Sequence, residues 1–282
     1  MSRIKVAIIG GSGIYKLDSI KIKNQHKIST PFGDPSAEIM ECEVDGYSFY
    51  FLPRHGIGHY LTPSEVNYRA NIFSLKKLGV DTIISISAVG SLREEYAPKH
   101  FVMVDQFIDW TKGFRKRTFF EAGIVGHVST ASPVEPTLSK RLFEASKRAG
   151  IVSHLGGTYV CIEGPQFSTK AESNIYRGFG ASVIGMTNVP EAYLAKEAGI
   201  AYATVAMVTD YDCWKEEHCT VQEIMDVMKL NYVSAQRFIQ EVISDLYKNP
   251  ISFDPENQYA VITDPSLHKP IHKEILEVIL KK

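Results

Sequence analysis

The feature that most constrains this sequence is a repeated pairing of a short apolar run with a polar, often glycine-containing turn. The runs are rich in β-branched residues and apolar throughout, a pattern typical of strands buried on both faces. They are KVAIIGGSG, YSFYFLPRHG, DTIISISAVGS, HFVMVDQFID, GGTYVCIEGP, ASVIGMT and AYATVAMVTDYD. Because helical patterns lie between them, the sequence predicts an α/β protein with a central mixed, mostly parallel sheet flanked by helices.

Helical patterns with start and stop residues separate or follow these runs. Ser64 and Thr137 are possible N-caps of the first two helices, and glycines end the first three. We expect helices at 64–79, 137–150, 189–199, about 221–247 and 271–282.

The chain shows no linker, repeat or low-complexity segment, so we expect one domain over residues 1–282. Residues 251–282 are the less certain part and form a C-terminal extension. The first apolar run is too short for a signal sequence, and no stretch has the length of a membrane helix. These features favour a cytoplasmic protein with no membrane partner.

The net charge and the cysteine content further limit the kinds of partner that the protein is expected to bind. The 31 Lys and Arg residues against 32 Asp and Glu give a formal net charge of −1, which does not favour nucleic-acid binding. Any bound anion must therefore be held by a local site. The four cysteines form no CxxC pair, and buried thiols in a reducing compartment are the simpler interpretation, although a Cys213–Cys219 bridge stays open.

Polar groups that suit an anion follow four of the predicted strands. Gly11 and Ser12 follow the first, Arg54 and His55 the second, Ser87 and Ala88 the third, and Met186 and Thr187 the sixth. Taken singly, a tight glycine turn or a salt bridge of Arg54 at the sheet edge would explain each group as well. Because ligands bind beyond the carboxyl ends of strands in such sheets, the four together predict one anion site.

The last strand ends in VTDYD, which carries Asp210 and Asp212. At a spacing of i, i+2 on a strand, the two carboxyl groups would point the same way. Helix capping or surface exposure is the ordinary alternative for aspartates. Beside an anion, one protonated and one ionised acid would suit a purine that needs a proton at N7 and an acceptor for its 6-amino group.

Two histidines and a basic cluster have simpler interpretations. His55 and His59 lie four residues apart, but the glycines around them disfavour a helix and no HExxH motif is present, so we expect no metal site. The cluster Lys112, Arg115, Lys116 and Arg117 predicts a solvated loop rather than a nucleic-acid patch.

The ordered motifs of the chain, taken together, resemble the methylthioadenosine phosphorylase branch of the trimeric purine nucleoside phosphorylase family. The resemblance extends from the first turn to the long helix. It rests on IGGSGIY, TPFGDPS, PRHGIGH, NYRANI, SAVGSLREE, DQFIDWT, IEGPQFSTKAES, GMTNVPE and AKEAGIAYATVAMVTDYDCW. It implies a single α/β domain that is active as a homotrimer or a dimer of trimers.

The resemblance also implies a role for each matching residue. The phosphate site would consist of Ser12, Arg54, His55, Ser87, Ala88 and Thr187. The nucleoside would contact Met186, Phe167, His127, Asp210 and Asp212, with Phe167 stacked on the base and Ser168 tuning base preference. The two aspartates would be the catalytic residues, and His127 would reach the pocket of a neighbouring subunit.

The expected reaction is the phosphorolysis of 5′-methylthioadenosine, and of adenosine as a further substrate, in purine and methionine salvage. Inorganic phosphate is then the co-substrate, and no metal or organic cofactor is expected. An apolar wall of Val221, Ile224 and Met225 would suit the methylthio group. A 6-oxopurine nucleoside phosphorylase, a hydrolytic nucleosidase and a non-catalytic nucleoside-binding protein remain the alternatives.

Overall fold

The computed structural model describes residues 4–11, 20–215 and 220–281. Its strands are β1 (Val6–Gly10), β2 (Lys21–His26), β3 (Ile39–Val44), β4 (Tyr47–Pro53), β5 (Thr82–Ser91), β6 (Phe101–Val104), β7 (Gln106–Trp110), β8 (Ser153–Leu155), β9 (Thr158–Ile162), β10 (Val183–Gly185) and β11 (Ala201–Asp210). Its α-helices are α1 (Tyr68–Lys77), α2 (Pro136–Arg148), α3 (Lys170–Gly178), α4 (Asn188–Glu197), α5 (Val221–Lys248) and α6 (Pro270–Ile279). Three short 3₁₀ helices are η2 (Asp212–Trp214), η3 (Glu256–Tyr259) and η4 (Pro265–Leu267).

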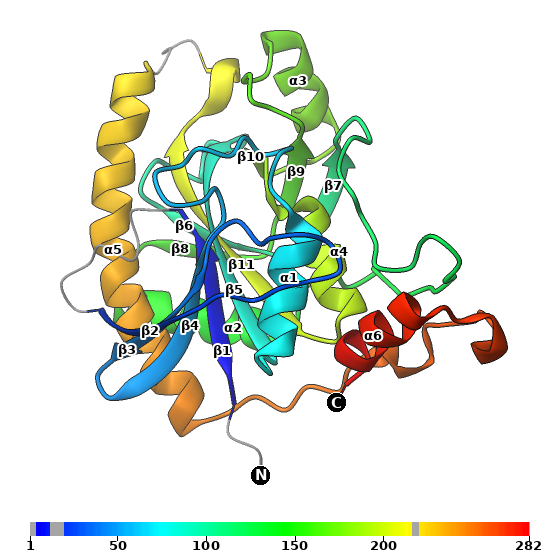
Figure 1. The fold of residues 1–282 in the computed structure, drawn as a ribbon. Coiled ribbons are helices and arrows are strands. Elements are labelled where there is room, and N and C mark those ends of the chain that lie inside the picture. The colour runs from blue at the N-terminus through cyan, green and yellow to red at the C-terminus, as the bar shows by residue number, and fades with distance from the viewer. Residues whose placement is uncertain (1–3, 12–19, 216–219, 282) are drawn as a thin grey trace.

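All the strands join one twisted sheet (Figure 1). Its main path runs β2-β3-β4-β1-β5-β10-β9-β7, and β11 leaves it by pairing with both β5 and β6, while β8 pairs with β6. Among the described strands, six of the ten pairings are parallel. The predicted mixed, mostly parallel α/β sheet is therefore confirmed.

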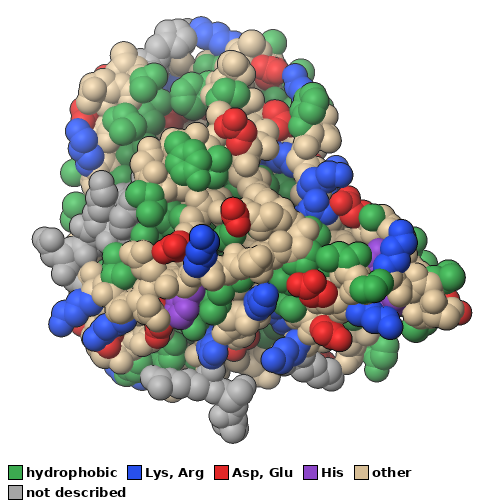
Figure 2. Space-filling model, in the orientation of Figure 1, with side chains coloured by type: hydrophobic (Ala, Val, Ile, Leu, Met, Phe, Trp, Pro, Cys, Tyr) green, Lys and Arg blue, Asp and Glu red, His purple; other side chains and the backbone are tan. Residues whose placement is uncertain are grey.

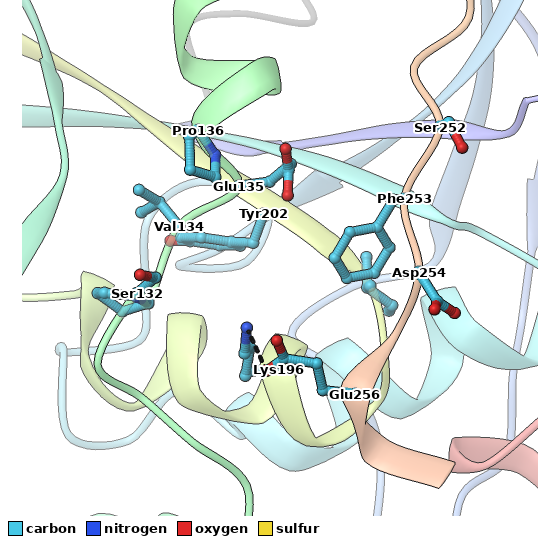
Figure 3. Close-up of a pocket in the computed structure, with 12 residues that line it drawn as sticks. Ser132, Val134, Glu135, Pro136, Lys196, Tyr202, Ser252, Phe253, Asp254 and Glu256 are labelled. Atoms are coloured by element: carbon cyan, nitrogen blue, oxygen red, sulfur yellow. Dashed lines mark ion pairs between the residues drawn. The ribbon is translucent and has the colours of Figure 1, made fainter.

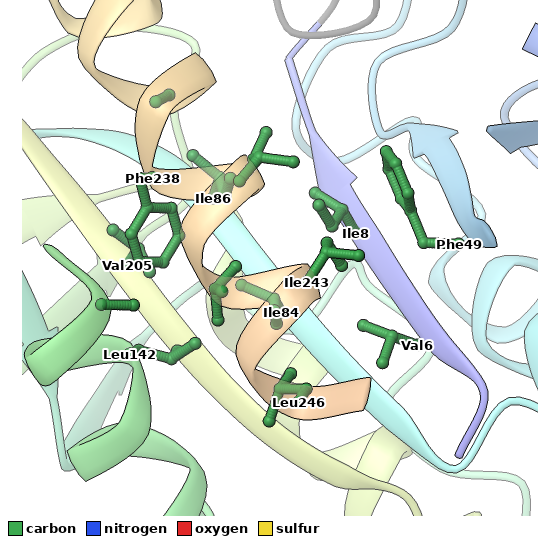
Figure 4. Close-up of a cluster of buried hydrophobic side chains, with 14 of the residues drawn as sticks. Val6, Ile8, Phe49, Ile84, Ile86, Leu142, Val205, Phe238, Ile243 and Leu246 are labelled. Carbon is green, nitrogen blue, oxygen red and sulfur yellow. The ribbon is translucent and has the colours of Figure 1, made fainter. Parts of the chain in front are cut away.

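Helices cover the sheet on both faces, because successive residues of its central strands face opposite sides. In β1, Val6 and Ile8 join the core beneath α2 and α5, whereas Ala7 and Ile9 join the core beneath α1, α4 and α6. Figure 4 shows Ile84 and Ile86 of β5 packed near Phe238 and neighbouring side chains of α5. Apolar runs without alternation thus arise because both faces of the strands are buried.

Several predicted boundaries are wrong. The run HFVMVDQFID forms two strands, β6 and β7, and these pair with different partners. Asn67 caps α1 in place of Ser64, whose hydroxyl group instead donates to Glu163, and Glu135 caps α2 in place of Thr137. The sequence pattern also missed β2, β3, β8 and α3.

Ile251 packs against the core on the α5 side of the sheet, and Ala260 and the residues of α6 pack on the α1 side. Ala260, Ile275 and Ile279 join the core cluster there, and α6 contacts α1. The division of the chain at residue 251 stays a prediction. In the described part of the chain, no helix combines the length and apolar character needed to cross a bilayer.

Candidate active site

A cavity of about 790 Å³ lies at the carboxyl ends of the strands, within the size range of small-molecule sites. Residues from seven parts of the chain form its wall. These parts are β5, β10 and α5, the ends of β1 and β11, the turn that follows β4, and the β9–α3 connection. Ten of the predicted site residues line it: Arg54, His55, Ser87, Ala88, Phe167, Ser168, Met186, Thr187, Asp210 and Asp212. Of the remaining two, Ser12 lies outside the described residues, and His127 is not part of this wall.

Arg54 is held at the floor of the cavity by a buried ion pair with Glu191 of α4. Their side chains are 2% and 1% exposed, and the Nε and Nη2 atoms of Arg54 donate to the two carboxylate oxygens at 2.7 and 2.9 Å. Ser85 and Tyr202 also donate to Glu191. A buried pair of this kind is stable only where such further hydrogen bonds satisfy it.

Arg54 therefore fits both interpretations that the sequence left open: it makes a salt bridge and it lines the cavity. Further donations go to the carbonyl oxygens of Ile9 and Ile86 and to the hydroxyl of Ser85. Among the described residues, no acceptor takes the second N–H of Nη1. The guanidinium is thus fixed in position and keeps one donor for a ligand.

Two hydroxyl groups meet above this pair. Ser87 Oγ of β5 lies 3.4 Å from Thr187 Oγ1, which follows β10 in the sheet. Both side chains are nearly buried and both line the cavity. Hydroxyl groups and a guanidinium at one point form a cradle of donors for a small oxyanion.

His55 is a neutral member of this end of the cavity. Its Nδ1 lies 2.9 Å from the carbonyl oxygen of Leu61, and its ring stacks on that of His59 at 4.2 Å. Burial, and then the charge of Arg54, lower the pKa of His55 to about 4. The described residues contain no cluster of His, Cys, Asp and Glu suited to a metal ion.

The opposite end of the cavity carries the two aspartates. Asp210 ends β11. Its Oδ1 lies 2.6 Å from the hydroxyl oxygen of Thr209, and its Oδ2 accepts a hydrogen bond from the backbone N–H of Asp212 at 2.9 Å. Burial raises the pKa of both carboxyl groups. A raised pKa favours the protonated carboxyl group, which can donate its proton.

The strand geometry predicted for this pair is wrong in one respect. Asp212 lies beyond β11, at the start of η2, and its φ is +51°. The two carboxyl groups share the cavity because the chain turns at Tyr211 and the Asp212 amide donates back to Asp210. A turn, and not alternation along a strand, brings them together.

Phe167 and Ser168 form the open rim of this end. Phe167 is 65% exposed, so its ring presents a free apolar face to the cavity. Ser168 accepts from the Cys213 thiol through its carbonyl oxygen, and its own buried hydroxyl has no partner in the described part of the chain. Cys213 is a free thiol, and Cys219 lies outside the described residues.

The apolar wall comes from α5, as expected, but with different members. Ile224 and Met225 line the cavity, whereas Val221 is 66% exposed and does not. The sequence interpretation missed Met228 and Tyr232, which lie one and two turns further along the same face of the helix.

Arg115 corrects the expectation of a solvated basic loop. Its side chain is buried, and its Nη1 and Nη2 groups donate to the carbonyl oxygens of Met186, Val189, Ile162 and Glu163. It also forms an ion pair with the Glu163 carboxylate at 3.2 Å. Arg115 thus fixes the ends of β9 and β10, from which Met186 and Thr187 enter the cavity.

Glu197, at the end of α4, anchors the same loop from the other side. It accepts from the hydroxyl of Thr118 and the backbone N–H of Phe119, and burial raises its pKa to about 7.

Neither Arg115 nor Glu191 has a local sequence signal, because each acts through contacts with residues far away in the chain. Their roles appear only in the folded chain.

A second, smaller cavity of about 190 Å³ contains none of the predicted site residues (Figure 3). It lies between the start of α2 and the C-terminal segment, and an ion pair of Lys196 with Glu256 crosses its wall. The larger cavity is therefore the candidate active site.

The surface around these features carries no dominant charge. On the face shown in Figure 2, basic and acidic side chains are interspersed, in keeping with the net charge of −1. Fold and cavity thus define an α/β protein with a site that can take an oxyanion and a flat, aminated ring together.

The chain belongs to the phosphorylase superfamily, whose family model matches residues 5–244. Similar proteins are named S-methyl-5′-thioadenosine phosphorylase. One from Geobacter sulfurreducens is 49% identical, over 98% of this chain and 97% of its own length. One from Thermofilum pendens is 48% identical, over 87% of this chain and 94% of its own.

Solved structures agree with this assignment. A methylthioadenosine phosphorylase from an Antarctic soil metagenomic library is 44% identical, with a TM-score of 0.92 and full coverage of both chains. The Schistosoma mansoni methylthioadenosine phosphorylase in complex with adenine is 37% identical, with a TM-score of 0.83, over 88% of this chain and 93% of that one.

Proposed function

We propose that this protein cleaves 5′-methylthioadenosine with inorganic phosphate, giving adenine and 5-methylthioribose 1-phosphate. The observation that carries the proposal is that one cavity holds both an oxyanion cradle and a pair of partly buried carboxyl groups. The names of the similar proteins support the substrate, as does the Schistosoma mansoni enzyme, which has been solved with adenine and, as a variant, with methylthioadenosine.

In the proposed mechanism, phosphate attacks C1′ of the ribose on the face opposite the base. Arg54, Ser87 and Thr187 hold the phosphate in line, and its negative charge stabilises the positive charge that develops on the sugar. Ser12, His55 and Ala88 complete the phosphate site in this proposal. The nucleophile is thus positioned before the bond to the base breaks.

The aspartates act on the leaving base. Asp210 supplies or stabilises the proton at N7, and Asp212 supports it and accepts from the 6-amino group. Phe167 stacks on the purine, Met186 contacts the ribose, and Ser168 adjusts base preference. This chemistry needs neither a metal nor an organic cofactor, because phosphate is the nucleophile and a carboxyl group is the acid.

The experiment is adenine release from 5′-methylthioadenosine with and without phosphate, together with measurement of the sugar phosphate. Phosphate-dependent release of both products supports the proposal. Equal release without phosphate indicates a hydrolytic nucleosidase, a preference for inosine indicates a 6-oxopurine phosphorylase, and binding without release indicates a non-catalytic protein.

We further propose that the active form is a cytoplasmic homotrimer or a dimer of trimers, in which His127 completes the site of a neighbouring subunit. His127 is exposed and does not line its own cavity. Light scattering of the purified protein measures the assembly. In an oligomer, His127→Ala raises the KM for the nucleoside, and an unchanged KM contradicts the shared site.

A further inference from the structure

The last strand of the sheet contains an irregularity beside the catalytic acid. Val208 pairs with Val89 of β5, but Asp210 pairs with the next residue, Gly90, so Thr209 is an extra residue in a β-bulge. Thr209 is nearly buried, and it lines the cavity together with Asp210. Bulges of this kind often re-aim side chains next to active sites.

The Thr209 hydroxyl group has one proton and two acceptors within reach. Its Oγ1 lies 3.0 Å from the carbonyl oxygen of Val89 and 2.6 Å from Oδ1 of Asp210. If the proton points to Val89, the short contact to Asp210 requires the carboxyl group to be the donor and therefore to be protonated. If the proton points to Asp210, the carboxyl group is ionised and accepts.

Among the groups next to Asp210, the Thr209 hydroxyl is a main influence on the protonation of the carboxyl group. On the β5 side, Gly90 lies against the carboxyl group and brings no charge. Several titratable or charged groups of the described residues face it or share its cavity. They are Asp212 and Cys213 of η2, Tyr176 of α3, Tyr232 of α5, and Arg54, His55, His59 and Tyr60 after β4. Of these, the backbone N–H of Asp212 donates to the other oxygen, Oδ2.

We propose that Thr209 is a positioning residue that controls where the proton of Asp210 resides. This inference rests on the function proposed above. Before the reaction, Thr209 donates to Val89 and accepts from the protonated carboxyl group. After the reaction, it donates to the carboxylate.

The proton balance of the step is simple. As the C1′–N9 bond breaks, its electron pair returns to the purine. The carboxyl O–H of Asp210 turns from Thr209 to the base, and the O–H bond breaks as an N–H bond forms there. The electron pair of the O–H bond stays on Asp210. The hydroxyl of Thr209 then rotates from Val89 to Asp210 and stabilises the new charge with a charge-assisted hydrogen bond.

The test is the pH profile of kcat for phosphorolysis by wild type, Thr209→Val and Thr209→Ser. Valine keeps the shape of threonine but cannot stabilise the carboxylate, so kcat falls about tenfold and the alkaline limb moves up by about one pH unit. Serine keeps the hydroxyl and restores both. Thermal unfolding of each variant separates a loss of stability from a shift of the limb.

A matched control exists at the far end of the sheet. Thr82 is equally buried, and its hydroxyl donates to the neighbouring Asp81 at 2.8 Å, but neither residue lines the cavity. Thr82→Val is expected to leave the pH profile unchanged. If Thr209→Val does not fold, Thr209→Ala removes the hydroxyl without any new atom and repeats the test.

The outcomes separate the two proposals. A wild-type protein that releases no adenine with phosphate defeats the proposed function. An active wild type whose alkaline limb stays in place in Thr209→Val or Thr209→Ala overturns only the role of Thr209. The same holds if Thr209→Ser fails to restore the limb.

Discussion

The two ends of the cavity are built in opposite ways. At the anion end, Arg54 is buried against Glu191, and the side chains of three further residues form a hydrogen-bond network around the pair: Ser85, Asn188 and Tyr202. At the base end, Phe167 is largely exposed, and the hydroxyl of Ser168 has no partner among the described residues. The carboxyl groups there are partly buried and form no ion pair with a basic side chain of the described residues.

This difference suits the two ends of the cavity to different tasks. A small oxyanion is the same in every turnover, so a fixed cradle can hold it with little reorganisation. In the proposed reaction the base is bound and then protonated, which requires groups whose hydrogen bonds and charge can change. The anion end is therefore expected to depend on structure, and the base end on protonation.

The largest effect is expected at Arg54. Arg54→Met leaves Glu191 buried without its partner, which lowers the free energy of unfolding by about 3–5 kcal/mol and removes nearly all phosphorolysis. Chemical denaturation and the adenine assay measure the two effects. The double variant Arg54→Met, Glu191→Gln is expected to regain stability but not activity; recovery of activity would contradict the role of Arg54 in binding phosphate.

The base end should respond in its chemistry rather than in its stability. Replacing both aspartates, Asp210→Asn with Asp212→Asn, lowers kcat/KM for 5′-methylthioadenosine by about 10²–10⁴-fold, the usual contribution of general acid catalysis. Asparagine can donate to a 6-oxo group, so relative activity on inosine should rise. An unchanged preference between the two nucleosides would refute the assignment.

Replacing Arg115 tests whether the base end of the cavity also depends on a buried, hydrogen-bonded side chain for its structure. Arg115→Met removes one donor from each of four backbone carbonyl groups and the positive charge beside Glu163, so we expect a loss of about 3 kcal/mol in stability and weaker nucleoside binding. Lys116→Met is the control, because Lys116 lies in the same loop but is 68% exposed. Equal unfolding midpoints for the two variants would show that Arg115 is not a support.

The smallest effect concerns the pH dependence of stability through Glu197. Its pKa is about 7 in the folded protein against an ordinary value of 4.5, so the folded state binds more protons between these values. The contribution of Glu197 is fully present below pH 4.5 and is lost as the pH rises through about 7. Unfolding of Glu197→Gln should therefore depend less on pH over this range, and an identical pH dependence would rule out this contribution.

The sequence predicted the helices and strands that are determined by local sequence patterns. Apolar runs marked every strand that is buried on both faces, but β2 is exposed along most of its length and lacks such a run. A capping box of Thr169 and Glu172 precedes α3 and is visible in the sequence, so this helix could have been found.

The residues of the candidate site that lie near the carboxyl ends of strands could be predicted from the sequence. Arg54 and Thr187 follow buried strands, and Ser87 lies in the second half of β5, so the general rule for such sheets brings them together. The bulge at Thr209 and the turn at Asp212 depend on pairing with β5 and could not be derived from spacing. Arg115 and Glu191 were missed because a buried charge is recognisable only from the partners that surround it.

The most direct test of the two-ended cavity is a crystal structure of the protein with phosphate and adenine bound together. We expect phosphate within hydrogen-bond distance of Arg54, Ser87 and Thr187, and adenine between Phe167 and the carboxyl groups of Asp210 and Asp212. Phosphate bound away from Arg54, or adenine bound with no contact to either aspartate, would contradict it.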